Sequence, residues 1–336
     1  MNTPVFWKTS LAEIDQAYES ATKVTEKRVL TLSAGGRPVY MLAYGPKKLK
    51  GKANLSSALG AFDKTCYTNA ENKIPCVVLI GAEHGQETEG VAGLMNLISV
   101  LETGVDLAGN PNKGIEELAA KVRLVIVPVA NPDGRARVEP AGIVGLKGYD
   151  LRYWGQGTWA DGSLCDYPAC KKIHPITGTG FLGGYFNDDG VNLMHDNFFH
   201  PMAKETQALL DLCADEIADF VIHLHGGSNS RGDLLQPCYV PIEVNQAIKE
   251  LSERCLAVGM KEGLEFAVHK IPEQAHGKSP ATFNLVTAAH HVCGAVSACY
   301  ESNECLIDEP GPHRTHAEIT RMHMILFEET MRMALE

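Results

Sequence analysis

Four side chains capable of metal binding or acid–base chemistry follow apolar segments of the chain. They are His84, Glu87, His225 and Glu301, and the apolar segments before them are 76–80, 219–224 and 295–300. Short apolar segments rich in β-branched residues are typical of buried strands. Open α/β sheets present their functional groups at the carboxyl ends of the strands, so we expect these four side chains to meet at one edge of a sheet.

Two histidines and one glutamate, with a fourth position left open, form a ligand set found in catalytic zinc sites. Zinc bound in this way lowers the pKa of a water molecule and polarises a carbonyl oxygen. A nearby carboxylate that is not a ligand, here Glu301, can take the proton of that water and pass it to a leaving nitrogen. The sequence therefore predicts an amide hydrolase with one zinc ion, although these ligands also accept other divalent ions.

The pair His84 and Glu87 has a simpler interpretation when it is taken alone. From Thr88 onward, apolar residues recur three and four positions apart, as they do in a helix. Glu87 could then serve only to stabilise the start of that helix, beside a histidine in a surface loop. The ordered set of strand ends favours the metal site over this alternative.

The rest of the pattern predicts strands that alternate with helices. Further strands are expected at 122–129 and 264–270, a hairpin over 28–44, and helices at 10–22, from 88, and at 204–217, 243–262, 279–291 and 313–335. This alternation is typical of a three-layer α/β/α sandwich with a mixed, mostly parallel sheet. Residues 1–336 are interpreted as a single domain, in which 47–72 is loop with a short helical piece near 55–62.

Residues 139–189 do not follow this alternation. They are rich in glycine and aromatic residues, including Trp154 and Trp159, and have no clear periodicity. A loop of this length inside a compact domain is unusual, and such loops are often functional. We interpret this segment as an insertion that faces the substrate, with a surface excursion as the alternative.

Composition limits the possible partners and compartments. The 336 residues carry a net charge of −11 with a pI near 5.6, which argues against nucleic acid and anionic membranes as partners. No signal peptide or apolar segment long enough to span a membrane is visible, so a cytoplasmic location is expected. The ten cysteines are expected to be buried thiols; Cys165 and Cys170 are the best candidates for a disulfide if the protein is exported.

Five motifs, taken in order, resemble those of the zinc metallocarboxypeptidase family, that is, carboxypeptidase A/D-like peptidases. They are Gly36-Arg37-Pro38, His84-Gly85-Gln86-Glu87, Asn131-Pro132-Asp133-Gly134, His225-Gly226-Gly227-Ser228 and Glu301. The resemblance implies that His84, Glu87 and His225 bind zinc and that Glu301 is the general base. It also implies a peptide or small amide as the substrate.

Neighbouring residues compete for these roles. His223 lies on the same strand face as His225, but the Gly-Gly that follows His225 favours His225 as the ligand. Glu304 is a weaker rival of Glu301, because it lies beyond the apolar segment. Glu83 and Glu89 are expected to be solvated or helix-capping charges.

The chain departs from the family where the substrate's terminal carboxylate is bound. The family usually has Gly-Val-Asp-Leu-Asn-Arg-Asn-Phe, whereas Met194 and His195 stand here at the Asn-Arg positions, with one residue inserted. The bidentate contact of an arginine guanidinium with the substrate's terminal carboxylate is therefore missing at this position. Where the family often has an oxyanion-stabilising arginine, the chain has Tyr185-Phe186-Asn187, and no tyrosine occurs in 274–284 to match the family's catalytic-site tyrosine.

Other cations could replace the missing arginine. Arg135, Arg137 and Arg152 are candidates, with Arg152 preferred; the alternative is that all three are surface arginines. His195, at the family's Arg position, is a further candidate for binding the substrate, beside Arg152 and Arg135. The leading hypothesis is a metallocarboxypeptidase that releases a C-terminal residue. The alternatives are an amidase or deacylase acting on cell-wall peptides or acylated amino acids, and a catalytically silent homologue that only binds zinc or peptide.

Overall fold

The structure is a computed structural model that describes residues 3–46, 74–166, 173–272 and 283–336. These residues build a seven-stranded sheet. Across the sheet, the strands are β1 (Glu26–Leu32), β2 (Pro38–Tyr44), β4 (Arg123–Val127), β3 (Cys76–Gly81), β7 (Phe220–Gly226), β9 (Val296–Asn303) and β8 (Asn229–Leu235). The four strands from β4 to β9 are parallel, while β2 and β8 run in the opposite direction.

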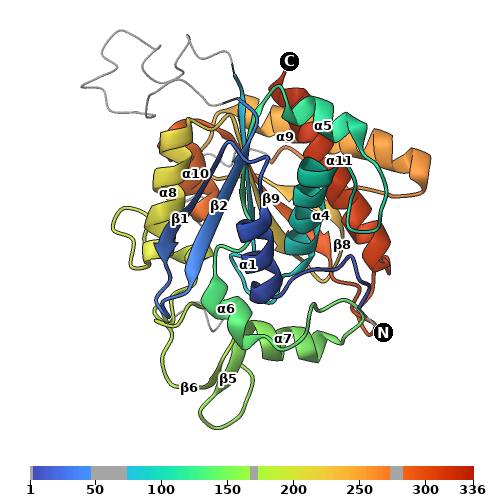
Figure 1. The fold of residues 1–336 in the computed structure, drawn as a ribbon. Coiled ribbons are helices and arrows are strands. Elements are labelled where there is room, and N and C mark those ends of the chain that lie inside the picture. Colours follow the sequence, from blue (N-terminus) through green and yellow to red (C-terminus); the bar gives the residue numbers. More distant parts are fainter. Residues whose placement is uncertain (1–2, 47–73, 167–172, 273–282) are drawn as a thin grey trace.

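Helices cover both faces of this sheet (Figure 1). One face is covered by α4 (Glu89–Thr103), α5 (Lys113–Ala119), α9 (Ile242–Gly259) and α11 (His316–Ala334), with α1 (Leu11–Ser20) beside them; the other is covered by α8 (Lys204–Glu216) and α10 (Leu285–Cys293). The predicted three-layer α/β architecture with a mixed, mostly parallel sheet is therefore confirmed.

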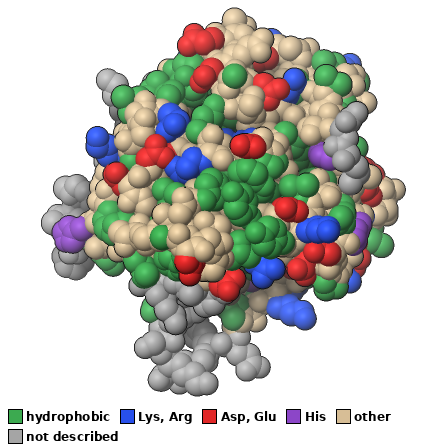
Figure 2. All heavy atoms as spheres, turned by 90° about the horizontal axis from the view of Figure 1, so that it is seen from below, with side chains coloured by type: hydrophobic (Ala, Val, Ile, Leu, Met, Phe, Trp, Pro, Cys, Tyr) green, Lys and Arg blue, Asp and Glu red, His purple; other side chains and the backbone are tan. Residues whose placement is uncertain are grey.

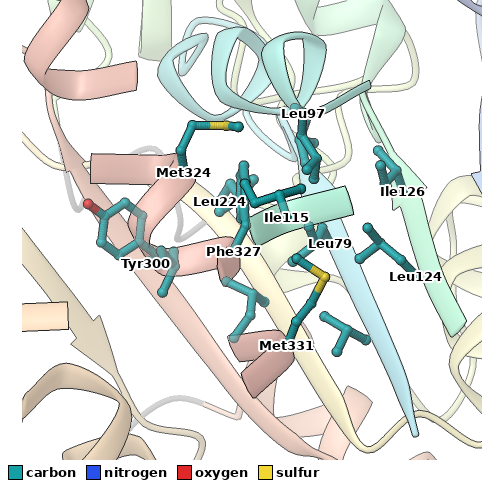
Figure 3. Packing of buried hydrophobic residues seen from close by; sticks show 14 of the residues in the cluster. Leu79, Leu97, Ile115, Leu124, Ile126, Leu224, Tyr300, Met324, Phe327 and Met331 are labelled. Atoms are coloured by element: carbon teal, nitrogen blue, oxygen red, sulfur yellow. The ribbon is translucent and has the colours of Figure 1, made fainter. Parts of the chain in front are cut away.

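The central strands are continuous apolar segments because both of their faces are covered. All six residues of β3 are buried, with alternate side chains in the two cores. In the larger core, Leu79 of β3 and Leu224 of β7 pack in one cluster with Phe327 and Met324 of α11 (Figure 3). Each fully buried side chain of this size contributes about 1.5–3 kcal/mol, so this layer holds the carboxyl ends of β3 and β7 in place.

Two details of the strand prediction differ from the structure. Residues 264–270 form no strand: Leu264 and Phe266 alternate because both pack into the core, and Ala267 makes only one backbone bond, to Arg231. The sequence does not predict the strand β8, because it is polar and contains Gly232. In the structure this glycine has a positive φ. The pairing of β8 with β9 alone makes it an edge strand, which does not need an apolar sequence.

The described residues of the segment 139–189, which are 139–166 and 173–189, contain more regular structure than the sequence predicts. They include a helix, α7 (Gly148–Gln156), and a two-stranded sheet of β5 (Gly157–Trp159) and β6 (Thr179–Leu182). With α6 (Pro132–Arg137), these elements lie at the lower side of the molecule in Figure 1. Figure 2 views that side and shows hydrophobic side chains gathered near its middle, with charges of both signs around them.

The structure tests some of the predictions on helices, cysteines and loops, while others concern residues that it does not describe. Cys76, Cys293 and Cys299 are buried, whereas Cys170 and the segment 47–72 lie outside the described residues, as does the predicted beginning of the helix at 279. Among the described residues, no helix has both the length and the apolar composition needed to cross a membrane.

Candidate metal centre

His84, Glu87 and His225 come together at the carboxyl edge of the sheet. The strands β3 and β7 are parallel neighbours, so the loop after β3 and the end of β7 lie at the same edge. One ligand atom from each of the three side chains lies within 4.8 Å of the others, and all three residues are buried. His84 Nδ1 lies 2.8 Å from Glu87 Oε1, and His225 Nδ1 lies 2.8 Å from Glu87 Oε2.

This donor set fits a zinc ion. Both imidazoles turn Nδ1 toward Glu87 and use Nε2 elsewhere, His84 with Asn192 Oδ1 at 3.2 Å and His225 with Glu83 Oε2 at 3.1 Å. Glu87 Oε2 is buried and, apart from its contact with His225 Nδ1, has no hydrogen-bond partner among the described residues, so it has lone pairs to offer a cation. Burial alone would raise the pKa of Glu87, but His84 and His225 lower it to about 2, so Glu87 is a carboxylate, as ligation requires.

The backbone of the first motif needs a glycine at position 85. A Cβ atom on Gly85 would lie 2.1 Å from Arg135 N and from the carbonyl carbon of Gly134. Gly85 N also donates to Gly184 O at 2.7 Å. The motif therefore packs directly on the Asn131–Gly134 turn, where Asn131 Nδ2 donates to the carbonyls of Glu83 and Gly184.

The Gly-Arg-Pro motif has a structural role in the described contacts. Arg37 Nη1 lies 2.8 Å from Asp133 Oδ1 and 2.9 Å from Asp188 Oδ2. Asp133 also accepts hydrogen bonds from Ser33 Oγ and Gly35 N. Arg37 thus ties the first hairpin to the turn that supports the metal loop.

Glu301 lies on β9 opposite His225 of β7 in the strand register. A Cβ atom on Gly227 would come within 2.7 Å of Glu301 Oε2, so this glycine leaves room for the carboxylate. Burial raises the pKa of Glu301 to about 7, partly offset by the charge of His225. A bound cation would lower this pKa and favour the carboxylate, the form that accepts a proton.

Glu304, the rival of Glu301, is placed differently. Its Oε2 accepts the Ser228 N–H, its Oε1 lies close to Gly226, and the side chain is fully buried. Burial, followed by the charges of Glu89 and Glu87, raises the pKa of Glu304 well above its usual range. The side chain of Glu304 is therefore engaged with the Ser228 N–H, whereas Glu301 lies opposite His225 in the strand register.

The expectation that Glu83 and Glu89 are solvated charges is wrong, whereas Glu89 does stand in the first turn of α4, where a capping charge was the alternative. Both side chains are completely buried, because β7 and β9 pack over the start of α4 and the loop before it. Glu83 bonds to His223 and His225, and burial raises the pKa of Glu89 to about 8. His223 contacts Glu83 and lies outside the three-residue ligand group.

The three predicted substrate residues have different surroundings. Arg135 is buried, and its Nε, Nη1 and Nη2 donate to the carbonyls of Thr9, Val138 and Pro140, so that it connects these loop segments. Arg152 is exposed on α7, where its Nε bonds to Gly148 O. His195 is half-buried at the end of a 3₁₀ turn, Leu193–His195, that begins next to Asn192.

Sequence reasoning missed two residues beside the ligands. Asn192 Oδ1 contacts His84 Nε2, and it stands at the Asp position of the family's Gly-Val-Asp, which was the available signal. The ring of Tyr185 packs edge-on against His84, with the ring centroids 4.0 Å apart. Burial and the charges of Glu87, Glu304 and Glu301 raise its pKa well above 10, so Tyr185 keeps its O–H as a donor.

The molecule is thus an α/β protein with a His-Glu-His group that could hold a metal ion at the carboxyl edge of its mixed sheet. The chain belongs to the zinc carboxypeptidase family, whose sequence profile matches residues 10–231. Family membership implies a zinc cofactor and supports metallopeptidase activity in general terms. A comparison with curated proteins gives no match.

Solved structures share the fold at low sequence identity. Carboxypeptidase A from Helicoverpa armigera has a TM-score of 0.58 and 14% identity, over 100% of this chain and 76% of its own. A metallo-carboxypeptidase from Burkholderia cenocepacia has a TM-score of 0.56 and 15% identity, over 95% and 67%. Bovine thrombin-activatable fibrinolysis inhibitor, solved with a tick carboxypeptidase inhibitor, has a TM-score of 0.56 and 13% identity, over 98% of each chain.

Proposed function

We propose that the protein hydrolyses a peptide or amide bond. The leading candidate is a metallocarboxypeptidase activity that removes a C-terminal residue. The observation that carries this proposal is the buried His84–Glu87–His225 group with Glu301 on the neighbouring strand. A zinc hydrolase needs both a ligand set and a carboxylate that is not a ligand, and this group offers both. Membership of the zinc carboxypeptidase family also supports the proposal.

The chain's own residues have separate tasks in this reaction. His84, Glu87 and His225 would hold zinc, which activates water and polarises a carbonyl when bound. Glu301 takes a proton from the attacking water and gives it to the leaving nitrogen. Tyr185, whose ring packs against His84, is our candidate for donating its O–H to the carbonyl oxygen of the scissile bond, in exchange for its hydrogen bond with Gln156.

The residues available to bind the substrate differ from those of the family more than the metal ligands do. Arg137, like Arg135, is engaged, with contacts to Asp188 and to the carbonyls of Leu182, Gly183 and Phe186. Arg152 and His195 are thus our remaining candidates for binding a terminal carboxylate. The altered Met194-His195 pair favours the second candidate function, an amidase or deacylase acting on a substrate without that carboxylate.

Peptide digestion separates these functions. The zinc-loaded protein is incubated with a mixed peptide library in two versions, with C-terminal carboxylates and with C-terminal amides, and the products are identified by mass spectrometry. Loss of one C-terminal residue from the carboxylate version alone supports the carboxypeptidase. N-acylated amino acids and cell-wall peptides are incubated in parallel, and release of an acyl group or cleavage of a cell-wall peptide supports the amidase. If all of these substrates stay intact with zinc still bound, the protein is a silent homologue.

Replacing Tyr185 by Phe is expected to lower kcat/KM about tenfold to a hundredfold, because a donor to the developing oxyanion is lost. Zinc content should not change, since Tyr185 is not a ligand. The measurement is steady-state kinetics on the best substrate from the library. Tyr153→Phe is the matched control, because Tyr153 stacks on Phe181 in the insertion. Equal activity of the two variants would remove Tyr185 from the mechanism.

A further inference from the structure

Three residues next to the metal ligands form a buried chain of contacts. Glu83 Oε1 lies 2.5 Å from His223 Nδ1, and Glu83 Oε2 lies 3.1 Å from His225 Nε2. All three residues are at most 3% exposed. The arrangement follows from the strands: His223 and His225 share one face of β7, and the neighbouring strand β3 ends two residues before Glu83.

The two histidine ligands therefore have unequal partners. His84 Nε2 meets the neutral amide oxygen of Asn192, which also accepts the Met194 N–H at 3.1 Å. His225 Nε2 meets a carboxylate oxygen instead. A carboxylate only accepts hydrogen bonds, so it holds the proton on Nε2 and leaves the Nδ1 lone pair directed at Glu87 and the metal position.

His223 has no function in the described contacts other than holding Glu83. Its Nδ1 bonds to Glu83, and its Nε2 has no hydrogen-bond partner among the described residues. A buried carboxylate needs a partner for each oxygen, and His223 and His225 supply one each. His223 thus fixes the orientation of the carboxylate that in turn fixes His225.

We propose that Glu83 and His223 are positioning residues for the metal ligand His225, acting as a chain in which His223 works through Glu83. This inference rests on His225 being a zinc ligand, as the proposed function requires. The competing role is a purely structural ion pair between β7 and the loop after β3. The two roles differ in whether the metal responds to a change of the carboxylate's charge.

The test measures metal affinity in Glu83→Gln, which keeps the side chain's size and removes its charge. Zinc affinity, determined by competition with a chelator, is expected to fall about 10–100-fold. The visible spectrum of the cobalt-substituted protein should also shift, because His225 becomes a weaker donor. Glu205→Gln is the matched control: Glu205 is equally buried, and its Oε1 contacts Ala34 N and Asn187 Nδ2. That variant should bind zinc as the wild type does.

A double variant tests whether His223 acts on His225 through Glu83. His223→Gln alone should weaken zinc binding less than Glu83→Gln does, and the double variant should lose no more than Glu83→Gln, because residues that act in series are not additive. His223→Gln also serves if Glu83→Gln does not fold. Unchanged affinity and an unchanged cobalt spectrum in folded variants would overturn the proposal.

The same experiment separates this inference from the proposed function. A wild-type protein that binds zinc, loses it in His225→Ala and still cleaves no amide contradicts only the proposed hydrolysis. A wild-type protein that is active, with affinity unaffected by Glu83→Gln, contradicts only the positioning role. If His225→Ala binds zinc as tightly as the wild type, both fail, because His225 is then not a ligand.

Discussion

Replacing Glu301 by Gln is expected to reduce kcat by about 10²–10⁴-fold while the zinc content stays that of the wild type. Glutamine cannot accept the proton of the attacking water, yet it preserves the size of the side chain beside Gly227. The measurement pairs turnover of the best library substrate with metal analysis of the same samples. This pairing distinguishes a lost base from a lost metal.

The matched control is Glu304→Gln, three residues further along the chain. Because burial raises the pKa of Glu304 well above its usual range, the acid is already neutral and an amide changes little. We expect this variant to keep most of its activity. If Glu304→Gln is inactive and Glu301→Gln is active, Glu304 is the general base and Glu301 is not.

Replacing Arg123 by Ala is expected to lower the free energy of unfolding by about 3–5 kcal/mol. Arg123 is completely buried at the start of β4. Its Nε and Nη2 bond to the two oxygens of Glu216 at 3.0 and 2.9 Å, Nη2 also bonds to Glu26, and Nη1 bonds to Thr25. Removing the guanidinium leaves the Glu216 carboxylate buried without its cation, which is the costly part of the change.

Urea unfolding of Arg123→Ala and Arg254→Ala measures this difference. Arg254 also contacts two carboxylates, of Glu250 and Glu336, but those lie at the surface, so its loss should cost about 1 kcal/mol or less. The double variant Arg123→Met/Glu216→Met should recover part of the lost stability, since the most deeply buried carboxylate of the cluster is then removed with its cation. Equal small losses at both arginines would contradict the account of Arg123.

The sequence identifies the parts of the fold whose signal is local. The segments 76–80 and 219–224 are apolar because both faces of β3 and β7 are covered, and the positions of His84 and His225 follow from the ends of those strands. Adjacent parallel strands then bring the two histidines together. The fold and the grouping of the three ligand candidates could be predicted for this reason.

What the sequence does not reveal depends on packing between distant segments. Glu83 looks like a loop charge, and only the position of β7 beside β3 shows that two histidines enclose it. Arg135 looks like a free cation, because the carbonyls that accept its hydrogen bonds carry no mark in the sequence. Tyr185 lies in a segment without periodicity, so no pattern placed its ring against His84.

The contacts of Gly184 bear on how this protein could be re-engineered. Its carbonyl accepts from Gly85 N and Asn131 Nδ2, and its N–H donates to Trp154 O. The segment 139–189 is therefore not a removable module, since excising it would strip the metal loop of its backbone partners. A graft of foreign sequence belongs at the exposed turn 161–163, away from His174 and Ile176, which bond to Asn192 and Gly190.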